Sequence, residues 1–169
     1  MPSPVGHALG GLAVGLLASS RPGWRLIAAC AVVAVLPDAD FLLPMQHRGP
    51  SQSVGAVAAA GVLAFVGLKF ASKTGDESRV ALVMAAAYGT HVVFDWLGAD
   101  SSAPRGLMAL WPFSSAFYIS GLDVFHSVDR RYWLDGFWKR NTIAGLRELL
   151  ILAPLVVAAW FARTRRRRR

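Results

Sequence analysis

Five apolar stretches, separated by more polar ones, divide the chain. They are Val5 to Ser19, Trp24 to Leu36, Val54 to Ala71, Val80 to Leu97 and Leu146 to Ala162. The last three approach the length of about 20 residues that a membrane-spanning helix needs, and the first two are shorter. Glycine and alanine recur within these stretches, which favours close packing of helices in a membrane. The pattern predicts an all-α fold, a polytopic helical membrane bundle of about five apolar helices.

Residues 98–145, between the fourth and fifth apolar stretches, are rich in charged and aromatic side chains. Nine large rings lie between Trp111 and Trp138. This segment is too polar to span a bilayer, whereas Trp and Tyr are enriched at the level of the lipid headgroups. We expect one domain, residues 1–162, with residues 98–145 as an interfacial cap and residues 163–169 as a basic cytoplasmic tail.

The composition supports a membrane protein, and the positions of the basic residues explain the positive net charge. Hydrophobic residues occupy 54% of the 169 positions, and the formal net charge is +8. Six of the arginines lie at the C-terminal end, at Arg163 and Arg165 to Arg169. An arginine run directly after an apolar segment is typical of a cytoplasmic anchor, and no aromatic residues interleave with it to stack on bases. We therefore expect membrane lipids as partners and no nucleic acid. The single cysteine, Cys30, rules out a disulfide framework and a cysteine-based metal site.

If the five apolar segments alternate in direction, the polar residues separate onto two ends. One end collects the aromatic cap and the residues His7, Asp38, Asp40, His47, Gln52, His91 and Asp95. The other end collects eleven of the eighteen basic residues and only two acidic ones, Asp76 and Glu77. Because the more basic side of a membrane protein faces the cytoplasm, we expect the N-terminus and the His and Asp residues outside and the C-terminus inside.

The histidines and aspartates of the first end form metal-ligand patterns. His91 and Asp95 lie four residues apart on one helical face and can bind the same ion. Asp38 and Asp40 follow Pro37, and a turn there can grip a cation with both carboxylates. Each pattern alone also has a structural interpretation, either a satisfied polar pair between helices or two solvated acids. Their convergence on one side favours a hydrolytic zinc, manganese or iron site.

The order of these motifs resembles a known family. The motifs are His7, the run Leu36-Pro37-Asp38-Ala39-Asp40, the run from His47 to Ser53, the run from Tyr88 to Asp95, and Leu110-Trp111-Pro112-Phe113. In this order they resemble the bacterial inner-membrane metal-dependent hydrolase family of the LexA-regulated type, over roughly residues 5–115. The ligand pattern of that family is distantly similar to zinc-dependent phospholipase C and P1-type nucleases.

The resemblance implies a bacterial inner-membrane hydrolase that cleaves a phosphoester in a lipid or envelope component. The implied cofactor is a divalent metal, zinc in the first place and manganese or iron as alternatives. The implied metal ligands are His7, Asp38, Asp40, His47, His91 and Asp95. Asp38, Asp40 or Asp95 can double as general base, and Arg48 suits a phosphate group, although an interfacial arginine also pairs with lipid headgroups.

One position departs from the family pattern. The family usually has His-Arg-Gly-x-Thr-His-Ser, where this chain has Gln52 in place of the second histidine. Glutamine is a weak oxygen ligand and cannot act as a general base. A metal-binding pseudoenzyme with a structural or stress role is therefore an alternative, and an ion or proton transporter is a less favoured one. His126, three residues after Asp123 in the cap, is a weaker candidate ligand.

Overall fold

The computed structural model describes residues 1–18, 23–42, 47–71 and 75–168. In this part of the chain the α-helices are α1 (Pro4–Leu17), α2 (Trp24–Val35), α3 (Val54–Ala71), α4 (Glu77–Leu97) and α5 (Phe137–Arg168), with the 3-10 helices η1 (Leu36–Leu42) and η2 (Pro50–Gln52). The described residues contain isolated bridges but no β-strand. The predicted all-α fold is confirmed. Three basic residues used in the charge argument, Arg21, Lys73 and Arg169, lie outside the described residues.

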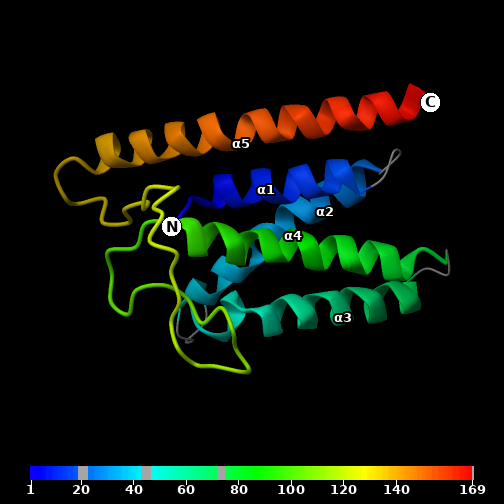
Figure 1. Ribbon diagram of the computed structural model, residues 1–169, viewed down its shortest axis with the longest axis horizontal. Coiled ribbons are helices and arrows are strands. Elements are labelled where there is room, and N and C mark those ends of the chain that lie inside the picture. Colours follow the sequence, from blue (N-terminus) through cyan, green and yellow to red (C-terminus); the bar gives the residue numbers. More distant parts are fainter. Residues whose placement is uncertain (19–22, 43–46, 72–74, 169) are drawn as a thin grey trace.

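The five helices lie side by side and alternate in direction (Figure 1). α1 packs against α2, α4 and α5, and α4 also packs against α2 and α3. The start of α1, the end of α2, the start of α3, the end of α4 and the start of α5 therefore meet at one end of the bundle, together with the cap. The C-terminus lies at the opposite end.

Glycines allow α1 to lie in the middle of the bundle. A Cβ atom on Gly11 would lie 2.2 Å from the carbonyl oxygen of Cys30 on α2, and one on Gly10 would lie 2.5 Å from the Phe94 ring on α4. Real Cβ atoms do not come this close to other atoms, so only glycine permits these approaches. The close packing brings the first turns of α1 against the end of α4, where a metal site was predicted.

The start of α1 is fixed by its cap and by α5. The Ser3 hydroxyl accepts a hydrogen bond from the Gly6 main-chain N–H at 3.2 Å, and Pro4 opens the first turn. The buried Glu148 of α5 accepts hydrogen bonds from the main-chain N–H and the hydroxyl of Ser3 at 2.7 and 2.5 Å. These contacts place His7, at the end of the first turn, facing the interior of the bundle.

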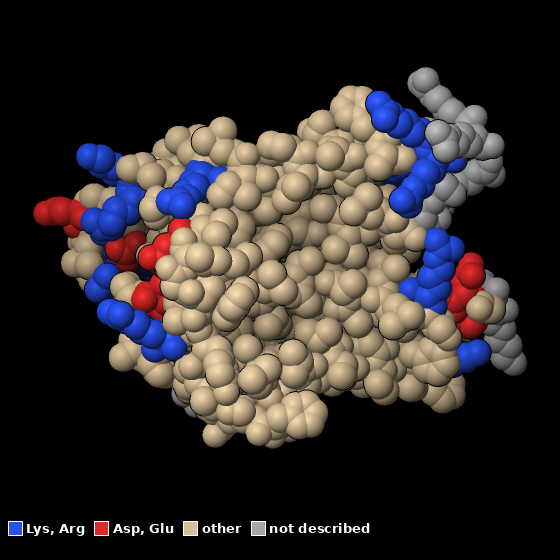
Figure 2. Space-filling model, viewed as in Figure 1, with Lys and Arg blue, Asp and Glu red and all other residues tan. Residues whose placement is uncertain are grey.

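The surface is that of a membrane protein. Three of the described helices, α3, α4 and α5, are long and apolar enough to cross a membrane. α3 buries none of its residues, so its apolar surface needs lipid to cover it. Figure 2 shows charged side chains at the two ends and an uncharged surface between them. α1 and α2 have 14 and 12 residues, which is too short to cross about 30 Å of hydrocarbon alone.

The fifth helix is longer than its apolar segment. It begins at Phe137 instead of Leu146, inside the range predicted as cap. Trp138, Lys139 and Arg140 make these first turns too polar for the hydropathy pattern to reveal. The irregular part of the cap is therefore residues 98–136, and it is tied to the bundle by main-chain hydrogen bonds. At the start of α3, the N–H groups of Val54 and Gly55 donate to cap carbonyls at 2.9 Å.

Candidate metal centre

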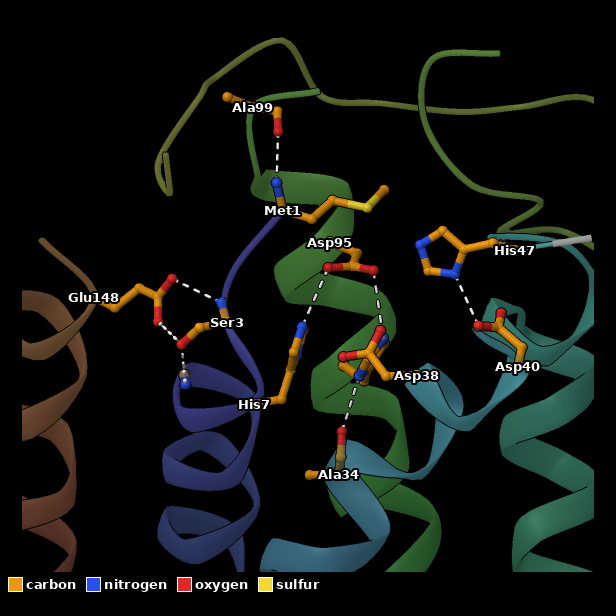
Figure 3. A network of polar contacts seen from close by, with 12 residues as sticks. Met1, Ser3, His7, Ala34, Asp38, Asp40, His47, Asp95, Ala99 and Glu148 are labelled. Carbon is orange, nitrogen blue, oxygen red and sulfur yellow. Dashed lines mark hydrogen bonds and ion pairs between the residues drawn. The ribbon is translucent and has the colours of Figure 1, made fainter. Parts of the chain in front are cut away.

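Four of the six predicted ligands meet in one cluster between α1, η1 and α4 (Figure 3). The two carboxylate oxygens of Asp95 lie 3.3 Å from Nε2 of His7 and 3.3 Å from Nε2 of His91. Asp38 contributes a carboxylate oxygen 3.7 Å from the same nitrogen of His91. His7, His91 and Asp95 are at most 1% exposed. The predicted convergence of residues from distant parts of the chain is observed for this set.

The protonation of His91 follows from a contact on its other side. Its Nδ1 lies 2.9 Å from the carbonyl oxygen of Ala34 on α2. A carbonyl only accepts, so Nδ1 carries a proton and donates it. In the neutral imidazole, Nε2 then presents its lone pair to Asp38 and Asp95. Two arrangements satisfy this geometry: a metal cation between the lone pair and the carboxylates, or a second proton on Nε2, which would form ion pairs with Asp38 and Asp95. The Nδ1 hydrogen bond to a carbonyl is the contact by which second partners orient histidine ligands of metals.

The donor set fits a divalent cation. Metal–ligand bonds of about 2.0–2.2 Å in a tetrahedral site place neighbouring ligand atoms about 3.3–3.6 Å apart. The separations of 3.3, 3.3 and 3.7 Å are of this size, and ligand atoms of His7, Asp38 and His91 all lie within 4.8 Å of one another. Among the described residues, Nε2 of His91 and both carboxylate oxygens of Asp95 have no hydrogen-bond partner. Buried polar atoms are normally satisfied, and a cation would satisfy these.

The two other predicted ligands, Asp40 and His47, form a pair beside this cluster. Nδ1 of His47 donates to one carboxylate oxygen of Asp40 at 2.8 Å. The other oxygen accepts from the Ser51 hydroxyl at 2.8 Å and from the Arg48 main-chain N–H at 3.3 Å. Asp40 therefore orients His47 and leaves its Nε2 available, as carboxylate partners of metal-binding histidines do. Direct ligation by Asp40 or His47 stays a prediction.

The two aspartates do not face one common point. η1 is a 3-10 helix with about three residues per turn, so residues two apart point in different directions. Asp38 faces His91, and Asp40 faces His47. Each aspartate thus contacts a different histidine, and binding of one cation by both carboxylates stays a prediction.

Burial shifts the pKa values of the two groups at the mouth of the cluster, and the shift of His47 favours metal binding. Burial raises the pKa of Asp38 above its ordinary value, although His91 and His7 oppose the rise. Burial lowers the pKa of His47, with the hydrogen bond to Asp40 opposing this shift. The lowered pKa keeps the imidazole neutral near pH 7, which is the form that binds metals.

Arg48 lies at the site, and its guanidinium is engaged by the cap. It forms an ion pair with Asp100 and donates a hydrogen bond to the Ser102 hydroxyl at 2.6 Å. Asp100 also accepts from the main-chain N–H of Gly106 at 2.8 Å. Arg48 thereby anchors residues 100–106 next to the cluster of His7, Asp38, His91 and Asp95. Its predicted contact with a phosphate group stays a prediction.

Arg130 is a site residue that the sequence analysis missed. Its guanidinium carbon lies 3.4 Å from the centre of the Phe41 ring, and Phe41 lies against His47 with ring centres 3.5 Å apart. Burial lowers the pKa of Arg130, and the charge of Asp38 opposes that shift, so the two side chains interact electrostatically. In the sequence Arg130 is one of several arginines in the cap, and no local pattern distinguishes it.

Gln52 and His126 have opposite surroundings. Gln52 is 0% exposed, and neither atom of its amide group has a hydrogen-bond partner among the described residues. It follows Ser51, whose hydroxyl binds Asp40. His126 is exposed in the cap, and its Nε2 accepts a hydrogen bond from Arg147 at 2.8 Å. The structure therefore gives no metal partner to the weaker candidate.

A cavity of about 1850 Å³ opens over the cluster, between α1, α2 and the cap. Of the four clustered residues only Asp38 lines it, next to His47 and Arg48. The cluster thus reaches the cavity through the Asp38 carboxylate, and the His47 imidazole beside the cluster also lines it.

Comparison with known proteins adds a family assignment. The family model described as YdjM inner membrane protein matches residues 1–166, and so covers the whole cluster, the cap and the five described α-helices except the last two residues of α5. No curated protein and no solved structure shows significant similarity to the chain.

Proposed function

The chain belongs to the YdjM inner membrane protein family, and on that premise we propose that it is a membrane-bound, metal-dependent hydrolase of a phosphoester. The observation that supports this most is the cluster of His7, Asp38, His91 and Asp95. Ligand atoms of His7, Asp38 and His91 lie within 4.8 Å of one another, and Nε2 of His91 and both carboxylate oxygens of Asp95 are buried without a hydrogen-bond partner among the described residues. The divalent cation is zinc in the first place, with manganese and iron as alternatives for the same nitrogen and oxygen ligands.

In the proposed reaction, water attacks the phosphorus atom and the ester P–O bond breaks. A divalent cation at the cluster supplies Lewis-acid polarisation of a phosphoryl oxygen and lowers the pKa of a water molecule. Asp38 reaches the cavity and accepts the proton of the attacking water. The protonated Asp38 then returns this proton to the leaving alcohol, while His47, kept in one orientation by Asp40, presents the lone pair of its neutral Nε2.

A metal-binding pseudoenzyme is the second candidate, and Gln52 is the observation in its favour. The metal-dependent hydrolase family that the motifs resemble usually has histidine at this position, and the glutamine amide here is buried without a partner among the described residues. A pseudoenzyme would bind the same metal and hydrolyse nothing. Transport is less favoured because the cluster lies at the ends of helices, with Asp95 two residues before the end of α4, and transporter sites lie near mid-membrane.

The full chain, purified in detergent and supplied with zinc or manganese, tests the proposal with a panel of phosphomonoesters, phosphodiesters and phospholipids. We expect metal-dependent release of product that falls by about 10²–10⁴-fold in Asp38→Asn, the range for loss of a general acid or base. The matched control is His126→Ala, which removes an exposed histidine of the cap and should retain full activity. If the wild-type protein binds metal but hydrolyses none of these compounds, the hydrolase proposal is wrong and the pseudoenzyme is supported.

A further inference from the structure

The cavity over the metal cluster has two walls of opposite character. One wall is apolar and comes from α1, α2 and the start of η1, with Pro4, Ala8, Ala31, Val32, Val35 and Leu36. The other comes from the cap and carries charged residues, among them Arg130, Arg131, Arg140, Asp129 and Asp135. Asp38 lies where the two walls meet. A ligand that fills this cavity must be apolar at one end and charged at the other.

The apolar wall continues into the part of the protein that lipid surrounds. Val32, Val35 and Leu36 recur at intervals of three and four residues, so they form one stripe along α2 and η1. Val32 is 66% exposed and Leu36 is 54% exposed. α2 runs away from the cap (Figure 1), and the stripe lies along it and the start of η1. Acyl chains from the bilayer can reach it without crossing water, and their contact covers the exposed side chains.

Arg130 is an arginine of the cavity whose guanidinium forms no ion pair with the described residues. The guanidinium groups of Arg131 and Arg140 pair with Asp129, at 3.3 and 2.8 Å, and that of Arg48 pairs with Asp100. Among the described residues, Arg130 stacks on Phe41 and forms no ion pair. A guanidinium held flat by an aromatic ring keeps its N–H groups free, and these match the oxygens of a phosphate group.

We propose that the cavity binds a phosphate-bearing membrane lipid, with the headgroup phosphate on Arg130 and the acyl chains along the stripe of Val32, Val35 and Leu36. The proposal names the substrate class of the hydrolase site. It rests on the proposed function, which supplies the phosphoester bond that is cleaved. A water-soluble phosphoester would leave the apolar wall uncovered. The cavity, at about 1850 Å³, also exceeds the range of about 300–1,000 Å³ that is usual for small ligands.

The test measures binding without turnover. The purified full chain is titrated in detergent, with a chelator present, with dihexanoyl phosphatidic acid, glycerol 3-phosphate and dihexanoylglycerol. We expect the phosphatidic acid to bind at least about tenfold more tightly than either fragment, because only it contacts both walls. Equal affinity for glycerol 3-phosphate and the lipid would show that the site accepts soluble phosphate, and would overturn the proposal.

Two pairs of matched variants test the two walls. Arg130→Gln should weaken binding of phosphatidic acid at least about tenfold, while Arg105→Gln, which removes the same charge from an exposed cap position outside the cavity, should not. Val32→Trp should weaken binding of the lipid and leave binding of glycerol 3-phosphate unchanged. Its control is Val62→Trp on α3, where the valine is similarly exposed, at 62%. Equal effects within each pair would overturn the assignment of the walls.

The outcomes separate this proposal from the hydrolase. Lipid binding that depends on Arg130, without hydrolysis of any phosphoester by the metal-loaded protein, would support the lipid site and reject the enzyme. Hydrolysis of soluble phosphoesters that neither Arg130→Gln nor Val32→Trp changes would support the enzyme and reject the lipid site.

Discussion

The imidazole of His91 on α4 donates a hydrogen bond from Nδ1 to the main-chain carbonyl of Ala34 on α2, at 2.9 Å. α2 ends one residue later, at Val35, and the last carbonyls of an α-helix have no partner within it. The end of α2 therefore supplies the acceptor that orients His91, and η1 then carries Asp38 to the opposite nitrogen. The position at which α2 ends therefore determines both the orientation of His91 and the position of Asp38.

The close packing of α1 on α2 positions His7, and substitution of Gly11 tests that packing. Gly11→Ala should lower the free energy of unfolding by about 1–3 kcal/mol, because its Cβ would overlap with Cys30 on α2. Gly67→Ala on α3 is the control, since nothing lies within 4 Å of a Cβ there and alanine favours the helix. Thermal unfolding in detergent should show opposite shifts. A shift of the same size and sign in both variants would exclude a close contact at Gly11.

Gln52→His tests whether the departure from the family pattern removed a metal position. Imidazole binds divalent metals far better than a carboxamide does, so the variant should bind more metal per chain and hydrolyse phosphodiesters faster. Gln52→Leu fills the same buried site without a ligand and should do neither. Unchanged metal content in Gln52→His, next to an active wild-type protein, would show that this position does not contact the metal.

The lowered pKa of Asp129 predicts how the stability of the cap depends on pH. The main-chain N–H of Arg131 and the side chain of Arg140 donate to its carboxylate and hold its pKa at about 2. The unfolded value is about 3.9. A lowered pKa stabilises the folded state above the unfolded pKa, and this contribution is lost as the pH falls toward 2.

Asp129→Asn should therefore lower the unfolding temperature at pH 6, and the difference from the wild-type protein should disappear between about pH 4 and pH 2. Asp135→Asn, at an exposed position of the same cap, is the control. A difference that stays constant across this range would show that the Asp129 carboxylate does not stabilise the cap.

The charge distribution predicts the orientation in the membrane. The end of the bundle with the cap carries seven basic and eight acidic residues, and the other end carries eleven basic and two acidic ones. The positive-inside rule places the second end in the cytoplasm. A reporter fused after Arg169 should work in the cytoplasm, and one inserted at the exposed Gly121 of the cap should work in the periplasm. The reverse result would turn the metal cluster toward the cytoplasm.

The sequence alone predicted the features that depend on a single physical signal. Hydropathy alone predicted Val54 to Ala71, and these are the bounds of α3, none of whose residues is buried. The same signal placed the start of the fifth helix at Leu146 instead of Phe137, because helix formation continues through polar residues that hydropathy cannot distinguish from a loop. The i, i+4 spacing of His91 and Asp95 gave a local pair, and that pair is in contact.

Roles that depend on contacts between distant segments were not predictable. The sequence grouped Asp38 with Asp40, but the 3-10 geometry of η1 directs them to different histidines. Arg48 was predicted to bind a phosphate group because it adjoins His47. Only the folded cap shows that its guanidinium forms an ion pair with Asp100. Arg130 was missed because its importance comes from Phe41, almost ninety positions away in the chain.

The most direct test of the metal centre is the zinc, manganese and iron content of the purified full chain, measured by mass spectrometry for the wild-type protein, His91→Ala, Asp95→Asn and His126→Ala. We predict about one divalent metal or more per chain in the wild-type protein and in His126→Ala. His91→Ala and Asp95→Asn should lose this metal and unfold at lower temperature, because the remaining buried carboxylates lose the cation that compensates them. A wild-type protein without metal, or an unchanged metal content in both His91→Ala and Asp95→Asn, would contradict the account.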